Sequence, residues 1–172
     1  MKKTLAYNYQ GYVNSKGFLN YGIPTAVICL IINYFSRGAA VPLVAVGPDL
    51  MITVFLTVLI CTLTGVPGIN AEVRKNAAPK APMNKWDHPF YSHFSDKLLP
   101  LAVQFALFST LIFGMIPSGI LATVASMSGN LSMAIDPITY FIVKSLYCGV
   151  FISFAMRWVT ACVLAQKTCS MK

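Results

Sequence analysis

Four long apolar segments divide this chain and leave it few ways to fold. They span residues 21–36, 49–66, 98–116 and 136–165. A helix needs roughly 20 predominantly apolar residues to cross about 30 Å of hydrocarbon. Within lipid every backbone polar group must be bonded internally, which a helix achieves. The sequence therefore predicts an all-α integral membrane protein with four transmembrane helices.

The composition favours a membrane protein over a soluble domain. Hydrophobic residues make up 56% of the 172 residues and charged residues only 10%, whereas an ordinary soluble domain carries about 25% charged residues. Four spans and one loop use nearly the whole chain, which leaves no room for a catalytic domain of ordinary size. The five cysteines include no C-x-x-C pair, so we expect neither a disulfide framework nor a zinc ribbon.

The basic residues lie between the apolar segments. Lys and Arg occur three times in residues 1–20, five times in residues 67–97 and three times from Arg157 to the C-terminus. The other two are Arg37, in a predicted outer connection, and Lys144, inside the fourth segment. Because cytoplasmic loops are enriched in Lys and Arg, we expect both termini and the middle loop in the cytoplasm of an inner membrane. This spread does not favour nucleic acid as a partner, since nucleic-acid binders gather their cations in a groove or stripe.

The predicted organisation has five parts. They are a cytoplasmic segment (1–20), a first transmembrane hairpin (21–66), a cytoplasmic basic and aromatic loop (67–97), a second hairpin (98–165) and a tail (166–172). The first apolar segment is short, so we expect its apolar continuation to Val46 at the outer interface or re-entering the membrane. In the loop, residues 76–85 predict an irregular linker and Trp86 to Phe94 an interfacial aromatic belt.

Short matches between the halves suggest two tandem helical hairpins. The pattern P-x-A-V begins at Pro24 and again at Pro100, 76 residues later, while Asp49 and Asp136 open the second and fourth segments, 87 residues apart. Each hairpin would cross out and back, so the halves would form a parallel pseudo-repeat about an axis near the membrane normal. Because apolar segments readily resemble each other, both duplication and chance similarity remain open at this point.

Two aspartates and one lysine are the charged residues of most interest. Asp49 and Asp136 stand at the predicted outer starts of their helices, where a carboxylate caps free backbone N–H groups; an acidic mouth that gathers cations is the alternative, and Arg37 could neutralise one of them. Lys144 follows Asp136 by eight residues, about 12 Å along a helix. Its ammonium costs on the order of 2.5–3.5 kcal/mol in the membrane unless it snorkels to the headgroups or meets a buried partner.

Polar residues recur at helical spacing in two of the predicted spans. The candidate solute-path residues are Asp49, Thr53 and Thr57 in the second span and Asp136, Tyr140, Lys144 and Tyr147 in the fourth. Asn33 and Gln104 are expected to join this interior. Ordinary helix packing, in which Thr and small residues let helices approach, explains such stripes equally well. Arg157 and Trp158 are expected to anchor the fourth span at the inner interface.

No cofactor or metal site is predicted. His88 and His93, beside Asp87 and Asp96, are five residues apart with a proline between them and make an incomplete zinc set. Both histidines lie outside the spans, which disfavours an intramembrane redox enzyme, and no catalytic motif is present, so we do not expect an enzyme.

The leading functional hypothesis is a small transporter or channel-like protein that moves a small solute or ion through the lipid bilayer as a homo-oligomer. The alternative is a non-transporting membrane subunit, anchor or assembly factor whose middle loop docks a cytoplasmic partner.

Overall fold

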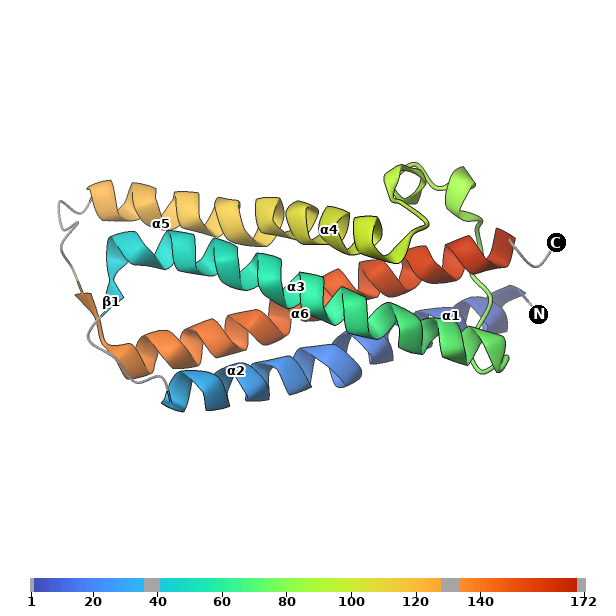
Figure 1. Ribbon diagram of the computed structural model, residues 1–172, viewed down its shortest axis with the longest axis horizontal. Helices are drawn as coiled ribbons and strands as arrows, with labels where there is room; N and C mark the ends of the chain where they lie inside the picture. The colour runs from blue at the N-terminus through green and yellow to red at the C-terminus, as the bar shows by residue number, and fades with distance from the viewer. Residues whose placement is uncertain (1, 36–40, 128–133, 170–172) are drawn as a thin grey trace.

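The computed structural model describes residues 2–35, 41–127 and 134–169 (Figure 1). Within these ranges four helical segments are long and apolar enough to cross a membrane. They are Asn8–Ile32, Ala45–Arg74, Leu98–Val124 and Pro137–Lys167. The prediction of an all-α protein with four membrane-spanning helices is thus confirmed.

The first and third spans are each built from three helical pieces. The first consists of α1 (Lys2–Ser15), the π-helical η1 (Lys16–Gly22) and α2 (Ile23–Phe35); the third consists of α4 (Leu98–Ser109), the π-helical η4 (Thr110–Met115) and α5 (Ile116–Met127). The second and fourth spans are the single helices α3 (Leu43–Arg74) and α6 (Pro137–Cys169). Each is preceded by a two-residue strand, β1 (Val41–Pro42) and β2 (Ala134–Ile135). The loop between α3 and α4 carries the 3-10 turns η2 (Lys85–Asp87) and η3 (Tyr91–His93).

The helices are longer than the apolar segments that predicted them. The first begins at Lys2 and not near residue 21, so the first span is not short. Residues 43–46 form the first turn of α3 and not a re-entrant segment, while residues 36–40, with Arg37, lie outside the described ranges. Helix α5 continues to Met127, well beyond the predicted end of the third segment. Hydropathy identifies only the part of a helix that lies in lipid. It does not predict the polar turns that extend the helix beyond the lipid.

The chain ends and the α3–α4 loop lie together at one end of the bundle, called here the loop end (Figure 1). Strands β1 and β2 pair antiparallel at the opposite strand end. Helix α2 runs along α6, the α4–α5 rod runs along α3, and α3 contacts α6 between these two pairs. The core lies in this central region, where Val54, Val58, Phe105 and Phe151 are completely buried.

The two halves repeat the same elements at one constant separation. Each π-helical piece ends two residues before a proline, and Pro24 and Pro117 are 93 residues apart. Strands β1 and β2 are separated by the same 93 residues; β1 leads directly into α3, and only Asp136 separates β2 from α6. Val41 pairs with Ile135 and Pro42 with Ala134, the register that a twofold axis would produce between equivalent strands. The structure therefore supports a parallel pseudo-repeat.

The alignment offsets inferred from the sequence are wrong. Pro24 lies in the middle of the first helix, whereas Pro100 lies in the first turn of α4. Asp49 lies within α3, whereas Asp136 precedes α6. The offsets of 76 and 87 therefore pair residues that occupy different structural positions, and 93 replaces them.

Small residues bring the first helix close to α6. A Cβ on Gly22 would lie 1.9 Å from the Ser153 hydroxyl oxygen, and a Cβ on Gly149 would lie 2.7 Å from the Ala26 methyl carbon. Each helix thus presents two small residues four positions apart, the pattern that lets membrane helices pack backbone to backbone.

Candidate functional site

An ion pair links α3 to α6 in the half of the bundle nearest the strand end. The Lys144 ammonium lies 2.6 Å from Oδ2 of Asp49, and the hydroxyl of Tyr140 donates to the same oxygen. The Lys144 side chain is 13% exposed and that of Asp49 is 41% exposed. Of the alternatives open for Lys144, the structure shows a largely buried ammonium with an ion-pair partner.

The two aspartates play different roles. Asp136 caps α6 as predicted, because its carboxylate accepts the backbone N–H of Thr139 at 2.9 Å and the hydroxyl of Thr139 at 3.0 Å. These hydrogen bonds hold the pKa of Asp136 below its ordinary value. The capping prediction is wrong for Asp49, because α3 begins six residues earlier at Leu43 and the carboxylate faces Lys144.

A cavity of about 420 Å³ opens between α3, α5 and α6 beside this ion pair. Its walls are mainly apolar and include Leu50, Pro117, Leu121 and Val143. The residues with polar groups along its wall come from α6 and are Thr139, Tyr140, Lys144 and Tyr147. The Lys144 side chain thus forms part of an apolar wall, while its ammonium is paired with Asp49 beside the cavity.

Tyr147 supports the wall of this cavity by a contact with a broken helix. Residue 117 is proline, which has no N–H, so the Phe113 carbonyl lacks its ordinary helical donor four residues later. The hydroxyl of Tyr147 donates to that carbonyl instead. This bond fixes α5 against α6 at the proline.

The remaining predicted residues lie elsewhere. Thr53 and Thr57 are half-buried on α3 and do not line the cavity. Gln104 is exposed, contrary to the prediction that it joins the interior, and its side-chain oxygen accepts the backbone N–H of Ser95 at 2.7 Å. The side chain of Asn33 is outside the described part of the structure.

A second ion pair near the loop end escaped the sequence analysis. Lys16 pairs with Glu72, and the hydroxyl of Tyr12 donates to the other carboxylate oxygen at 2.5 Å. Glu72 follows Asp49 by 23 residues, about 35 Å along α3. One signal for this ion pair was available in the sequence, because Glu72 is the only glutamate in the chain. Lys16 was considered only as one of the basic residues that flank the spans.

Thiols and a hydroxyl lie between these two ion pairs. Thr25 Oγ1 is 3.9 Å from Cys61 Sγ. Cys29 and Cys148 are free cysteines on the first helix and α6. The contact between the first helix, α3 and α6 therefore contains polar side chains at several positions along the helices.

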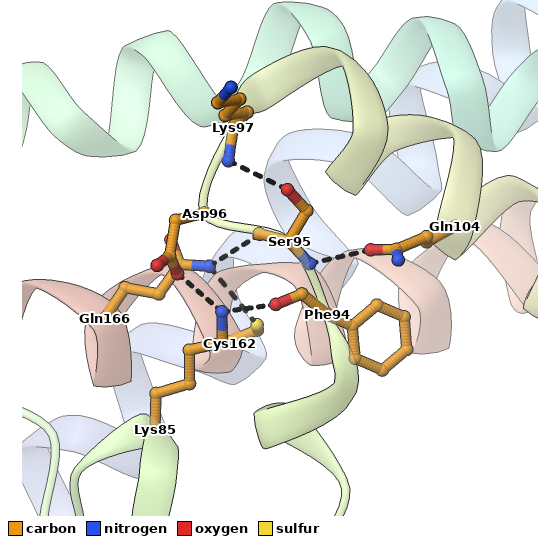
Figure 2. A network of polar contacts seen from close by, with 8 residues as sticks. All are labelled: Lys85, Phe94, Ser95, Asp96, Lys97, Gln104, Cys162 and Gln166. Carbon is orange, nitrogen blue, oxygen red and sulfur yellow. Dashed lines mark hydrogen bonds and ion pairs between the residues drawn. The ribbon is translucent and has the colours of Figure 1, made fainter.

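The middle loop folds into a cap on the loop end, anchored by Lys85 (Figure 2). The Lys85 side chain is 1% exposed, and its ammonium donates to the Phe94 carbonyl and to Asp96. The amide of Gln166, on α6, donates to the Ser95 carbonyl at 3.1 Å. These bonds tie the loop to the end of α6.

Two phenylalanines of the segment predicted as an interfacial belt, Phe90 and Phe94, point into the bundle. Phe94 stacks on Phe105 with ring centroids 4.1 Å apart, and Phe90 contacts Phe108 and Trp158. Trp86, by contrast, is 61% exposed. Trp158 thus packs within this cluster, whereas Arg157 lies beside an open groove.

The histidines serve the local turn. His88 Nδ1 lies within hydrogen-bonding distance of the backbone N–H groups of Phe90 and Tyr91, and its ring stacks on Tyr91. Burial raises the pKa of Tyr91. Within the described ranges no three His, Cys, Asp or Glu side chains form a group that could hold a metal ion.

Comparisons of the chain with protein-family models, curated proteins and solved structures found no match. Any function must therefore be argued from the geometry of the cavity and its ion pair.

Proposed function

We propose that this protein is a carrier that moves a small amphipathic anion across the membrane through the cavity between α3, α5 and α6. The observation that supports it is the Asp49–Lys144 ion pair beside an apolar cavity of about 420 Å³, whose wall includes the Lys144 side chain. The apolar walls suit the body of such a solute. Its anionic group would take the place of Asp49 at the Lys144 ammonium.

Stability alone gives little reason for this ion pair to exist. Moving two charges out of water costs about as much as their attraction returns, and well-packed apolar residues often do as well or better. Intramembrane ionisable residues are rare and commonly mark substrate or ion pathways. We therefore interpret the contact between Asp49 and Lys144 as an ion pair that a substrate can open.

The packing below the cavity favours a carrier over an open channel. Toward the loop end, Phe105, Phe151 and Met156 are completely buried where the helices meet. The folded loop then lies beside α6 and the start of α4 at this end of the bundle (Figure 1). This packing separates the cavity from the loop end, as in a carrier that is closed toward that end in one of its two states.

Each half contains a point of bending that would let the protein change between the two states of a carrier. Transporters often consist of structural repeats that rock against each other around a central site. Here each half carries a π-helical piece just before a proline, and helices bend at such places. Rocking about Pro24 and Pro117 would open the loop end while closing the cavity.

A permanently charged amphiphile tests this proposal. Radiolabelled octanesulfonate would be offered to liposomes containing wild-type protein, Lys144→Ala or Lys80→Ala, whose target lysine is exposed on the loop. We expect uptake by the wild type and by Lys80→Ala, and uptake at the protein-free level for Lys144→Ala at equal reconstitution. Equal uptake by Lys144→Ala and the wild type would remove Lys144 from the mechanism. Absence of wild-type uptake across a series of alkyl sulfonates and phosphates would reject the carrier proposal.

Docking of a cytoplasmic partner through the loop is the second candidate. Met83 and Trp86 are 48% and 61% exposed and give the loop two large apolar side chains that a partner could cover. A Met83→Ser/Trp86→Ser variant should lose a bound partner in pull-down and keep octanesulfonate uptake if docking is a separate role. If no partner copurifies with the wild type, this candidate falls.

Location and assembly complete the proposal. We place the loop end in the cytoplasm of an inner membrane because the basic residues of the loop and both chain ends gather there. Accessibility labelling of a cysteine introduced at Lys80 tests this side, and native mass spectrometry tests the proposed homo-oligomer.

A further inference from the structure

Arg157 lies on α6 near the loop end, and placing Pro137 at the outer edge of the hydrocarbon puts Arg157 at the level of the inner headgroups. It follows Pro137 by 20 residues, about 30 Å along the helix and close to the thickness of the hydrocarbon core. Its side chain crosses Gly17, where a Cβ would lie 2.4 Å from the Arg157 Cγ. The neighbouring Lys16 pairs with Glu72, so charged groups of the first helix, α3 and α6 share this level.

The guanidinium of Arg157 has no anionic partner in the described structure. The ion pairs there are Lys16–Glu72, Lys85–Asp96 and Lys144–Asp49. The ring of Phe154, 5.8 Å from the guanidinium carbon, is a weak cation–π contact. Gly17 thus lets the aliphatic stem of Arg157 lie against the first helix. The guanidinium charge is not paired with an anion in the described structure.

A groove of about 560 Å³ runs beside Arg157 between the first helix and α6. Phe18, Leu19 and Val150, each more than half exposed, form its apolar part, while Asn14 and Ser15 lie on its polar side. A second groove of about 420 Å³, lined by Tyr9, Gln10 and Trp158 among others, borders Arg157 as well. Neither groove shares a lining residue with the cavity at Lys144.

We infer that the groove beside Arg157 is a binding site for an anionic phospholipid, with the lipid phosphate on the guanidinium and an acyl chain along Phe18, Leu19 and Val150. The planar guanidinium binds phosphate oxygens through paired N–H donors. Basic pockets between membrane helices at the headgroup level recognise anionic lipids in this way. Asn14 and Ser15 offer further polar groups to the headgroup. The site is independent of the proposed transport.

Native mass spectrometry of the purified full-length protein tests this site. The protein would be titrated with phosphatidylglycerol and with phosphatidylcholine of identical acyl chains. We expect the wild type to hold phosphatidylglycerol about tenfold more tightly, and Arg157→Gln to lose that preference, a difference of about 1.4 kcal/mol. Arg74→Gln, which removes an exposed arginine at the end of α3, should keep the preference.

A second variant separates the groove from the charge. Val150→Trp fills the apolar part and leaves Arg157 in place, so it should lose the tightly held phosphatidylglycerol while its melting temperature without lipid stays near that of the wild type. This variant also decides the question if Arg157→Gln does not fold. An unchanged lipid preference in Arg157→Gln, or in a folded Val150→Trp, would overturn the inference. An equal loss in Arg74→Gln would do so too, because it would indicate general charge attraction.

Discussion

Lys144 reaches Asp49 across 95 residues of sequence and joins the two longest helices by a bond of 2.6 Å. Each residue comes from a different half of the pseudo-repeat, so the contact closes the bundle near the strand end. Tyr140 completes it by donating to the same carboxylate oxygen.

Removing one partner of this pair should destabilise the fold more than removing both. Lys144→Met leaves Asp49 unpaired, and we expect a loss of about 1–3 kcal/mol. The 3–5 kcal/mol typical of buried pairs is too high because Asp49 is 41% exposed. Asp49→Asn/Lys144→Met should recover most of this loss. Thermal unfolding in detergent, arranged as a double-mutant cycle, measures the coupling. Additive losses would show that the pair contributes no stability, and octanesulfonate uptake should stay lost in the double variant.

Tyr147→Phe should cost about 1 kcal/mol, because it leaves the Phe113 carbonyl without a donor. Pro117→Ala restores a backbone N–H four residues after Phe113 and should make the tyrosine hydroxyl dispensable. We therefore expect Tyr147→Phe to cost clearly less in the Pro117→Ala background. The same cost in both backgrounds would mean that proline is not the reason for the contact.

Gly22→Ala should destabilise the protein by about 1–3 kcal/mol, because its methyl group would collide with the Ser153 hydroxyl. Gly11→Ala is the matched control, since a Cβ there meets nothing within 4 Å. In a helix this substitution should be neutral or stabilising by up to about 1 kcal/mol. Unfolding of both variants in the same detergent decides between a packing effect and a general glycine effect.

Lys85→Met should loosen the loop cap at a cost of about 1–3 kcal/mol, since it removes the donor to the Phe94 carbonyl and to Asp96. Lys80→Met, on the exposed part of the same loop, should change stability by less than about 0.5 kcal/mol. Limited proteolysis should cut the loop of Lys85→Met faster. Equal cleavage of the two variants would show that Lys85 does not anchor the cap.

Asp136 should make stability depend on acid. Its folded-state pKa lies below the ordinary 3.8 because Thr139 donates two hydrogen bonds to the carboxylate. The resulting stabilisation is fully present above the ordinary pKa and is lost as the pH falls through the lower, folded value. Asp136→Asn keeps a capping side chain without a titrating charge. The melting temperature of the wild type should therefore fall relative to that of Asp136→Asn as the pH drops from 5 to 2.

Hydropathy and helical spacing predicted the fold and part of the site. Four spans, the cap at Asp136 and the placement of Tyr140 and Lys144 on one stripe of the fourth helix follow from periodicity. Lys144 attracted attention because a membrane charge requires a partner. Which partner it finds depends on how α3 and α6 lie side by side, and periodicity along one helix says nothing of that.

The features that escaped prediction depend on contacts between distant segments. The burial of Lys85 follows from the way the loop folds over α6, although its sequence neighbours are typical of a solvated linker. The repeat offset of 93 was missed because it rests on π-helical pieces and two-residue strands, which have no clear sequence signature. Short matches such as P-x-A-V instead aligned residues that occupy different structural positions in the two halves.

Neither hairpin of this protein contains its own core. The first helix packs chiefly on α6, and α3 packs on the third span. The main packing partner of each helix therefore lies in the other half of the chain. The first helix must therefore remain in the bilayer without its main packing partner until α6 has been synthesised. Stable tertiary structure can form only after synthesis of the whole chain, and separately expressed halves should acquire it only by meeting each other.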